Sequence, residues 1–148
     1  MTRRAWYLLV NSVVGLWAVA AVLVISVHRY FPAGGWLMVH LVLLGAVSAA
    51  ILVWSQHFAD AVLRRPAPGE RVSHGARLVG HTLGAALVVT GIVTDTWILV
   101  LGGGGVLAVV ALAHVVLVAL QARRALPARF GPLVPYYVAA PLALVFGV

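Results

Sequence analysis

Residues 36–58, WLMVHLVLLGAVSAAILVWSQHF, contain no charged side chain. A helix of ~20 such residues crosses the ~30 Å hydrocarbon core of a bilayer, so this run predicts a membrane-spanning helix. Similar apolar runs lie on both sides of it, and open strands would leave backbone groups unsatisfied in lipid. We therefore predict an all-α, integral membrane helical bundle of four to five transmembrane helices. Its single domain, residues 1–148, would contain helices at about 5–27, 36–58, 75–94, 97–120 and 130–148.

The composition of the whole chain agrees with a membrane protein. Of its 148 residues, 64% are hydrophobic and 9% are charged, and the mean hydropathy is +1.09. Roughly a quarter of the residues of a soluble domain are charged, and disordered chains are poor in apolar residues, so both classes are excluded. The absence of cysteine excludes disulfides, thiolate metal sites and cysteine nucleophiles.

Motifs for common enzyme reactions are missing from the sequence. It contains no nucleophile with an adjacent base, no P-loop, no dinucleotide-binding glycine fingerprint and no paired carboxylates. A hydrolase or a kinase is therefore not supported. An electron-transfer or binding module is a better interpretation than a complete enzyme.

The basic residues lie at alternate breaks between the apolar runs. The net charge is +7, and nine of the ten arginines lie at the N-terminus or in the second and fourth breaks: Arg3, Arg4, Arg64, Arg65, Arg71, Arg77, Arg123, Arg124 and Arg129. Each would meet lipid headgroups there, which explains the basicity without nucleic acid. Because arginine accumulates on the cytoplasmic side of membrane proteins, we expect a multi-pass protein of the inner (plasma) membrane with a cytoplasmic N-terminus.

The fifth apolar run, residues 130–148, differs from the others because it contains Pro132, Pro135 and Pro141. Proline inside a helix removes a backbone hydrogen bond and kinks or ends the helix. We expect a short, kinked or partly interfacial helix here, and whether it spans the membrane stays open.

Six histidines in a chain with three acidic residues are the main chemical anomaly. No carboxylate is placed as a buried counter-ion, so neutral imidazoles are expected in the membrane. Counting ~1.5 Å per residue from the arginine clusters places His57, His81 and His114 in the cytoplasmic half of the bilayer. His28 and His40 lie near the outer surface. Two sites follow: an inner one with His57 and either His81 or His114, and an outer one at His40.

Histidines from neighbouring helices at one depth are the axial ligands that a b-type haem requires. Small residues such as Gly45, Gly80 and Gly84 would line the slot for its macrocycle. The chain would then pass electrons between the membrane and a redox partner. We predict haem b as the cofactor, with the binding residues His40, His57, His81 and His114.

The same residues also have structural interpretations. Small residues permit tight helix packing, and histidines can bond across helices to hydroxyls such as those of Ser48, Ser55 or Thr82. His28 and His74 would be interfacial side chains that reach headgroups. A cofactor-free membrane anchor or assembly subunit would need nothing more.

Copper is a further alternative at the outer surface. Met38 and His40, with His28 across a short turn, combine a thioether with imidazoles, and such ligands suit Cu(I). This interpretation predicts a copper-binding membrane protein with the metal ligands His28, Met38 and His40.

Three segments carry a family resemblance: HLVLLGAVSAAILVWSQHFADAVLR at 40–64, PARF at 127–130 and YYVAA at 136–140. They resemble the membrane-spanning N-terminal region of actinobacterial multicopper oxidases and copper nitrite reductases, over nearly the whole chain. His40, Gly45 and the Ser55-x-His57-Phe58 motif also look like helices of haem-copper oxidases and NnrS-type membrane proteins, where such histidines bind haem or copper.

The resemblance implies a membrane module associated with copper and respiratory redox chemistry, with His40 and His57 as ligands. The oxidases continue into further helices and cupredoxin domains that hold the catalytic copper, so their activity is not carried over. The expected partners are the lipid bilayer, a redox partner such as a cupredoxin-type protein, and a second copy of the chain in a homo-oligomer.

Overall fold

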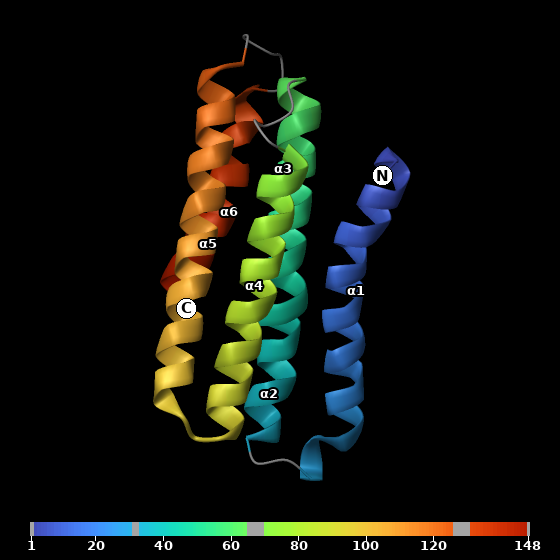
Figure 1. Ribbon diagram of the computed structural model, residues 1–148, viewed down its shortest axis with the longest axis vertical. Helices are drawn as coiled ribbons and strands as arrows, with labels where there is room; N and C mark the ends of the chain where they lie inside the picture. Colours follow the sequence, from blue (N-terminus) through green and yellow to red (C-terminus); the bar gives the residue numbers. More distant parts are fainter. Residues whose placement is uncertain (1, 31–32, 65–69, 126–130, 148) are drawn as a thin grey trace.

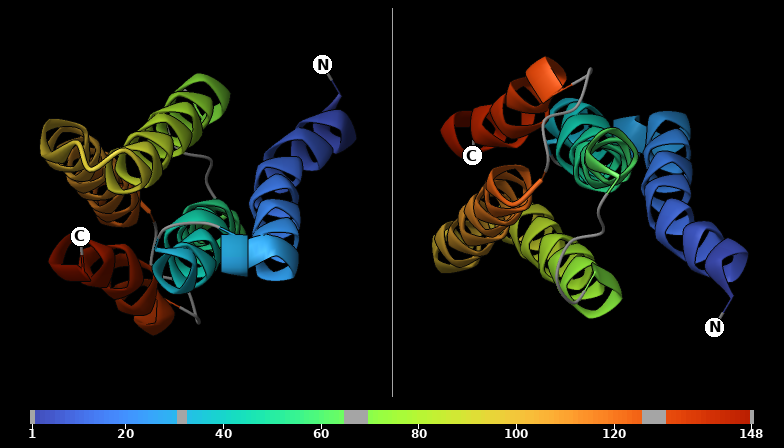
Figure 2. Two further views of the ribbon diagram at one scale, coloured as in Figure 1. Left: turned by 90° about the horizontal axis from the view of Figure 1, so that it is seen from below. Right: turned by 90° about the horizontal axis from the view of Figure 1, so that it is seen from above.

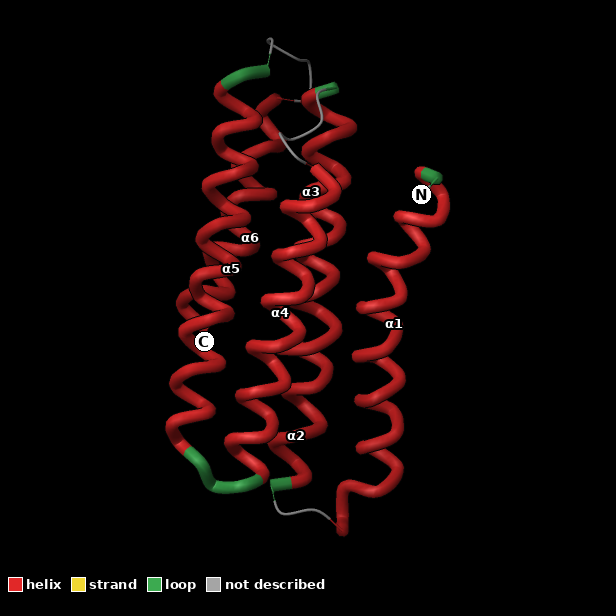
Figure 3. Tube along the Cα trace, viewed as in Figure 1, coloured by secondary structure: helices red, strands yellow, loops and turns green. Residues whose placement is uncertain are grey.

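The computed structural model describes residues 2–30, 33–64, 70–125 and 131–147, and all regular elements within these ranges are helical (Figures 1 and 3). In chain order they are α1 (Arg3–Val27), η1 (His28–Tyr30), α2 (Gly34–His40), η2 (Leu41–Val47), α3 (Ser48–Leu63), α4 (Glu70–Val93), α5 (Trp97–Arg123), η3 (Gly131–Leu133) and α6 (Val134–Gly147). The prediction of an all-α helical bundle is confirmed.

Four helical stretches are long and apolar enough to cross a membrane: Arg4–Tyr30, Gly34–Leu63, Arg71–Val93 and Trp97–Arg123. Large apolar side chains remain exposed on their outer faces, for example Leu16 at 68% and Ile98 at 74%. Helices that are apolar on the outside as well as the inside are typical of membrane spans. The chain is thus a multi-pass membrane protein whose outer surface faces lipid.

The last helix, α6, is shorter than the other four. Its apolar part covers Val134–Phe146 and contains Pro141, whose missing N–H removes a helical hydrogen bond. Figure 1 shows α6 starting near the end of α5 and stopping part-way along the bundle. The prolines therefore correctly predict a short helix. Residue 130, the predicted start, lies outside the described residues.

The segments α2, η2 and α3 follow one another directly and form a central rod. The antiparallel pair α4 and α5 packs on one side of it, α6 packs against α3 and α5, and α1 packs mainly against η2 (Figure 2). The side chains of Val10, Leu52, Leu78 and Val110 from four different helices meet in one core cluster. This arrangement brings α3 into contact with each of the other long helices.

The η2 segment is a π-helix within this rod. The Ser48 N–H bonds to the carbonyl of Leu43, five residues back, and the Ser48 hydroxyl donates to the carbonyl of Leu44. A Cβ atom added to Gly45 would lie 2.6 Å from the Trp17 ring of α1, so glycine permits this contact. The predicted slot at Gly45 is therefore filled by Trp17.

Glycine also lies at the contact between α4 and α5. A Cβ atom on Gly103 would lie 2.6 Å from the Gly84 carbonyl oxygen and 2.8 Å from the Val88 nitrogen. A Cβ atom on Gly80 would lie 2.9 Å from the Val110 side chain. These glycines serve close helix packing, as the structural interpretation predicts, and α5 fills the slot that a haem was predicted to occupy.

The arginine-rich segments lie toward one end of the bundle. In Figure 1 the N-terminus, the end of α3 and the end of α5 point in that direction, and η1 and the α4–α5 turn lie at the opposite end. The side chains of Arg4, Arg64, Arg71 and Arg123 are exposed there, and that of Arg29 is exposed at the opposite end. The fold thus places more exposed arginines at one end of the bundle than at the other, and the predicted orientation depends on this difference.

Candidate functional site

Two serines of α3 each bond to a histidine from a neighbouring helix. Ser48 and Ser55 are about two helical turns apart and lie on one face of α3. His81 of α4 donates from Nε2 to Ser48 Oγ at 2.6 Å, and His114 of α5 donates from Nε2 to Ser55 Oγ at 2.7 Å. The imidazoles are only 2% and 1% exposed. The predicted interhelical bonds to Ser48 and Ser55 are confirmed.

The direction of these bonds follows from the single proton of each hydroxyl. Ser55 Oγ donates to the Ile51 carbonyl at 2.5 Å, and Ser48 Oγ donates to the Leu44 carbonyl. Each oxygen must therefore accept from the imidazole, which carries its proton on Nε2. In a neutral imidazole the other nitrogen, Nδ1, is then a lone-pair acceptor.

The two Nδ1 atoms have different surroundings. His114 Nδ1 accepts from Nη1 of Arg77, so both nitrogens of His114 are bonded. His81 Nδ1 is buried and has no hydrogen-bond partner among the described residues. A buried polar atom without a partner is costly, and a missing ligand is one explanation for it. Of the two imidazoles, His81 therefore has the ring nitrogen that the described residues do not use.

Arg77 is buried in the bundle, so the prediction that it meets lipid headgroups is wrong. Its side chain is 6% exposed. Nε donates to the Ser73 carbonyl at 3.2 Å, Nη2 donates to Gln56 Oε1 at 3.1 Å, and Nη1 donates to His114. The helix begins at Glu70, about two turns before Arg77, and the guanidinium is therefore inside the helical span.

Asp60 is connected to Arg77 through side-chain amides. Gln56 Nε2 and Gln121 Nε2 donate to Asp60 Oδ1 at 2.9 and 2.7 Å. Gln56 Oε1 accepts from Arg77, so one amide joins the guanidinium to the carboxylate. The prediction that no carboxylate is placed as a buried counter-ion needs a correction. The half-buried Asp60 carboxylate reaches the buried Arg77 cation through the Gln56 amide.

Neither Gln56 nor Gln121 is among the residues predicted from the sequence, and Arg77 was predicted to lie at the headgroups. Both glutamines are 2% exposed. A signal is present: Gln56 directly precedes His57, and Gln121 follows His114 by seven residues and so lies on the same face of α5. An amide within an apolar run needs a partner just as a histidine does.

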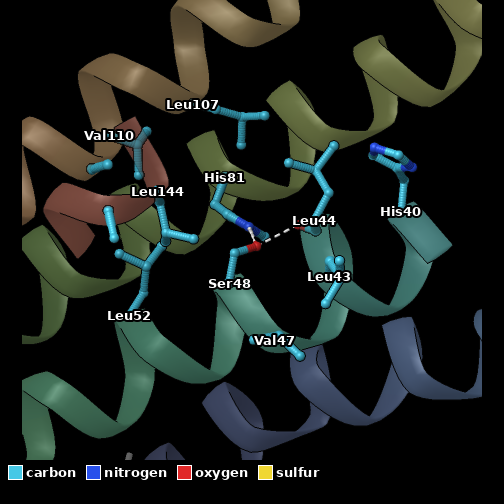
Figure 4. Close-up of a pocket in the computed structure, with 12 residues that line it drawn as sticks. His40, Leu43, Leu44, Val47, Ser48, Leu52, His81, Leu107, Val110 and Leu144 are labelled. Carbon is cyan, nitrogen blue, oxygen red and sulfur yellow. Dashed lines mark hydrogen bonds between the residues drawn. The ribbon is translucent and has the colours of Figure 1, made fainter. Parts of the chain in front are cut away.

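A cavity of about 300 Å³ adjoins the Ser48–His81 pair, and we call it the His81 cavity (Figure 4). Most of its wall consists of leucine, valine and alanine side chains from η2, α3, α5 and α6. The polar residues that line it are His40, Ser48 and His81. The wall residues Leu43 and Val47 are 54% and 41% exposed on the outer surface. The cavity therefore opens toward lipid, and its volume is that of a small ligand site.

The histidines predicted to bind copper each bond to a carbonyl about one turn back. The ring of His40 stacks on Trp36 with centroids 3.8 Å apart, and its Nδ1–H donates to the Trp36 carbonyl at 2.8 Å. His28 is exposed, as expected of an interfacial side chain, and donates from Nδ1 to the Ile25 carbonyl at 2.8 Å. Met38 is half-buried in α2. Within the described ranges no group of three His, Cys, Asp or Glu residues could hold a metal ion, and copper stays a prediction.

His57 lies where α3 faces α1. Its Nδ1 is 3.3 Å from the Tyr7 hydroxyl, and its ring meets those of Tyr7 and Trp54 edge-on, with centroids 5.1 and 5.7 Å apart. The three predicted inner ligands therefore have separate partners. His57 bonds to Tyr7, whereas His81 and His114 bond to the serines of α3.

A second cavity, of about 10 Å³, has a mostly polar and aromatic wall that contains Trp6, Tyr7, Gln56, His57, Asp60 and His74 beside two valines. His74 is 6% exposed, packs edge-on against Trp6 at 6.1 Å, and has an unpartnered Nε2 in the described structure. A cavity of this size holds about one water molecule. The prediction that His74 reaches headgroups is wrong, because Trp6 of α1 covers it.

Most of the buried polar residues thus belong to two neighbouring sites. One is a hydrogen-bond network around Arg77, which uses both nitrogens of His114. The other is the His81 cavity, which has a mostly apolar wall. No protein-family model, curated protein or solved structure matches the chain.

Proposed function

We propose that this chain is a membrane-embedded binding module whose His81 cavity holds a lipid-soluble redox cofactor. The observation that carries the proposal is the His81 cavity itself, a mostly apolar space of about 300 Å³ whose polar lining residues are His40, Ser48 and His81. Ligand sites typically combine apolar walls with a few polar groups that orient the ligand. The opening toward lipid selects a ligand that is dissolved in the membrane.

A redox role is supported by the resemblance of residues 40–64 to respiratory copper oxidases. In this proposal the bound cofactor exchanges electrons with a partner, such as a cupredoxin-type protein. The arginine-rich end of the bundle faces the cytoplasm, and the protein resides in the inner (plasma) membrane, because positive charge is retained on that side.

The residues around the cavity fit haem b only in part. A b haem needs axial imidazole nitrogens, and its two propionates need cations or hydrogen-bond donors. His81 offers one free ring nitrogen, whereas both nitrogens of His114 are already bonded. The polar residues lining the cavity are His40, Ser48 and His81, with no arginine among them. The histidines available to a haem in this cavity would be His81 and His40, whose Nδ1 bonds to the Trp36 carbonyl and leaves Nε2 as the acceptor.

Absorption spectra and organic extracts of the purified protein test the proposal. We expect a redox-active cofactor to copurify with the wild type, seen as a difference between oxidised and dithionite-reduced spectra. The Ala143→Trp variant should lose it, because Ala143 lines the cavity and an indole there would fill the space. Ala139→Trp, at an exposed position on the same helix, should retain it. Wild-type protein that neither carries nor takes up a redox-active cofactor would overturn the proposal.

A cofactor-free membrane anchor or assembly subunit is the second candidate. It is favoured by the serine partners of His81 and His114, which satisfy one nitrogen of each ring without any ligand. This candidate predicts a blank spectrum for the wild type and a small stability change for His81→Ala.

A further inference from the structure

We propose that His40 orients the ligand of the His81 cavity: its Nε2 atom accepts a hydrogen bond from a hydroxyl or N–H group at the polar end of a neutral, long-chain molecule. The inference rests on the proposed function, because it names the class of ligand and the residue that positions it in the same cavity. Three observations support it. His40 has an accessible acceptor nitrogen, the other polar side chains of the lining bond to each other, and the far end of the cavity is apolar.

The ring of His40 is fixed by two contacts with Trp36. It stacks on the indole with centroids 3.8 Å apart, and its Nδ1–H donates to the Trp36 carbonyl at 2.8 Å. Because the carbonyl can only accept, the proton of the neutral ring is on Nδ1 and the lone pair is on Nε2. Nε2 is thus an acceptor in a ring that is already held in place.

The Nε2 atom of His40 can be reached by a ligand. Among the described residues, the buried side-chain atoms without a partner are His74 Nε2 and His81 Nδ1. His40 Nε2 has no described partner either, but it is not one of these buried atoms, and its half-buried ring lines the cavity. Figure 4 shows the His40 ring and the Leu44 side chain extending from the rod on the same side. The acceptor therefore keeps accessible surface in a ring that lines the cavity.

The other two polar side chains of the lining already bond to each other. His81 Nε2 donates to Ser48 Oγ, and the Ser48 hydroxyl donates to the Leu44 carbonyl. The remaining nitrogen of His81 is buried, so a ligand in the cavity does not reach it. His40 is therefore the lining side chain whose acceptor is both unbonded and accessible.

The polarity of the cavity changes along its length. His40 lies toward the η1 end of the bundle, ~9 Å after the start of α2 at Gly34. Leu52, Val110 and Leu144 line the opposite end (Figure 4). A molecule with its polar end at His40 and its chain among these apolar side chains matches this gradient.

The charge of the lining selects a neutral ligand. No charged side chain is among the described lining residues, so an ionic ligand would lack a counter-charge, which is costly in the membrane. A lone-pair nitrogen takes either a hydrogen-bond donor or a metal ion. The described part of the chain has no group of three metal-ligating residues, and a donor is therefore the partner that we infer.

Two matched probes test the inference. 4-Decylphenol and 4-decylanisole have the same ring and chain, but only the phenol has a hydrogen-bond donor. Both are titrated into detergent-purified protein, with tryptophan fluorescence as the signal because Trp36 stacks on His40. We expect the phenol to bind about tenfold more tightly than the anisole, which is the magnitude of one hydrogen bond in an apolar site.

Variants assign this difference to His40. His40→Phe keeps a ring that can stack on Trp36 and removes the acceptor, so the two affinities should become nearly equal. His28→Phe is the matched control and should keep the tenfold difference, because His28 likewise bonds through Nδ1 to a carbonyl about one turn back but is not among the described lining residues. Ala143→Trp should prevent binding of both probes, whereas Ala139→Trp should bind them like the wild type.

Brominated probes measure the orientation of the ligand without any substitution in the protein. A bromine atom quenches tryptophan fluorescence at short range. We expect bromine on the phenol ring to quench more than bromine at the end of the decyl chain, because the ring would lie beside His40 and Trp36. Equal quenching, or stronger quenching from the chain end, would overturn the orientation even if His40→Phe does not fold.

The outcomes separate this inference from the proposed function. Equal affinity of the wild type for the two probes, with both blocked by Ala143→Trp, would overturn the role of His40 and leave the cavity as a binding site. A tenfold difference that persists in His40→Phe, or a haem or copper spectrum that this variant loses, would also overturn it. Failure of both probes, together with the absence of a copurified cofactor, would overturn the proposed function itself.

Discussion

The guanidinium of Arg77 is a cation inside a membrane-spanning helix, where an isolated charge is strongly unfavourable. Three acceptors from α3, α4 and α5 surround it, and Gln56 connects it to the carboxylate of Asp60. Removing one member of a buried charged network leaves the others without partners. Arg77 therefore stabilises the association of three helices, and its effect should be large.

We expect Arg77→Ala to lower the free energy of unfolding by about 2 to 4 kcal/mol, because His114 Nδ1 and Gln56 Oε1 both lose their donor. Arg77→Lys should restore only part of this loss, since one ammonium cannot reproduce the planar fork of donors. Thermal unfolding in detergent measures both variants. Arg123→Ala, at an exposed position, is the control and should match the wild type. Equal stability of Arg77→Ala and Arg123→Ala would contradict the buried network.

Ser55 is the acceptor for His114, and its contribution should be smaller. We expect Ser55→Ala to destabilise the protein by about 1 kcal/mol, the magnitude measured for hydrogen bonds between membrane helices. Ser12 offers a matched control, since it is exposed and bonds only within its own helix, to the Leu9 carbonyl. Ser12→Ala should change stability by a few tenths of a kcal/mol. Chemical denaturation of the two variants side by side checks the difference.

At the scale of the elements, the π-helix η2 separates His40 from Ser48. A π-helix contains more residues per turn than an α-helix, and such segments are frequent at functional sites. Here it ends directly before Ser48, whose hydroxyl bonds to both the Leu44 carbonyl and His81. The wider turn of η2 changes the direction in which the following side chains point. It therefore helps to determine which residues of the 34–63 stretch face the His81 cavity.

The α4–α5 contact depends on glycine at one position of α5 and not at another. Gly103→Ala would place a Cβ atom 2.6 Å from the Gly84 carbonyl, and we expect a loss of about 1 to 3 kcal/mol from overpacking. Gly105 has nothing within 4 Å of its Cβ position. Gly105→Ala should therefore be neutral or stabilising by up to about 1 kcal/mol, because alanine favours a helix. Thermal unfolding of the pair tests this, and a Gly103→Ala variant as stable as Gly105→Ala would rule out close packing there.

At the scale of the whole molecule, the orientation prediction can be tested directly because the chain contains no cysteine. Thr94 and Arg123 are exposed at opposite ends of the bundle. In intact spheroplasts a membrane-impermeant maleimide should label Thr94→Cys, and it should label Arg123→Cys only after lysis. The reverse pattern would show that the arginine-rich end lies outside the cell.

Two parts of the structural interpretation agree with the structure. Histidines of α4 and α5 bond across helices to Ser48 and Ser55, and Gly84 lies at a close helix contact. The placement of Arg77 is wrong for a physical reason. Distance along the sequence places a residue near a break, but the residue at which a helix begins depends on its contacts with neighbouring helices.

Hydropathy alone determined that this chain folds as membrane-spanning helices, because the cost of placing a residue in hydrocarbon depends mainly on that residue. The alternation of arginine with apolar runs likewise determined which breaks share one side of the membrane. Only the tertiary structure decided that Arg77 bonds to His114, that His57 faces Tyr7, and that His81 bonds to Ser48 beside a cavity. These contacts depend on the rotation of each helix about its axis, which results from the packing of all the helices together.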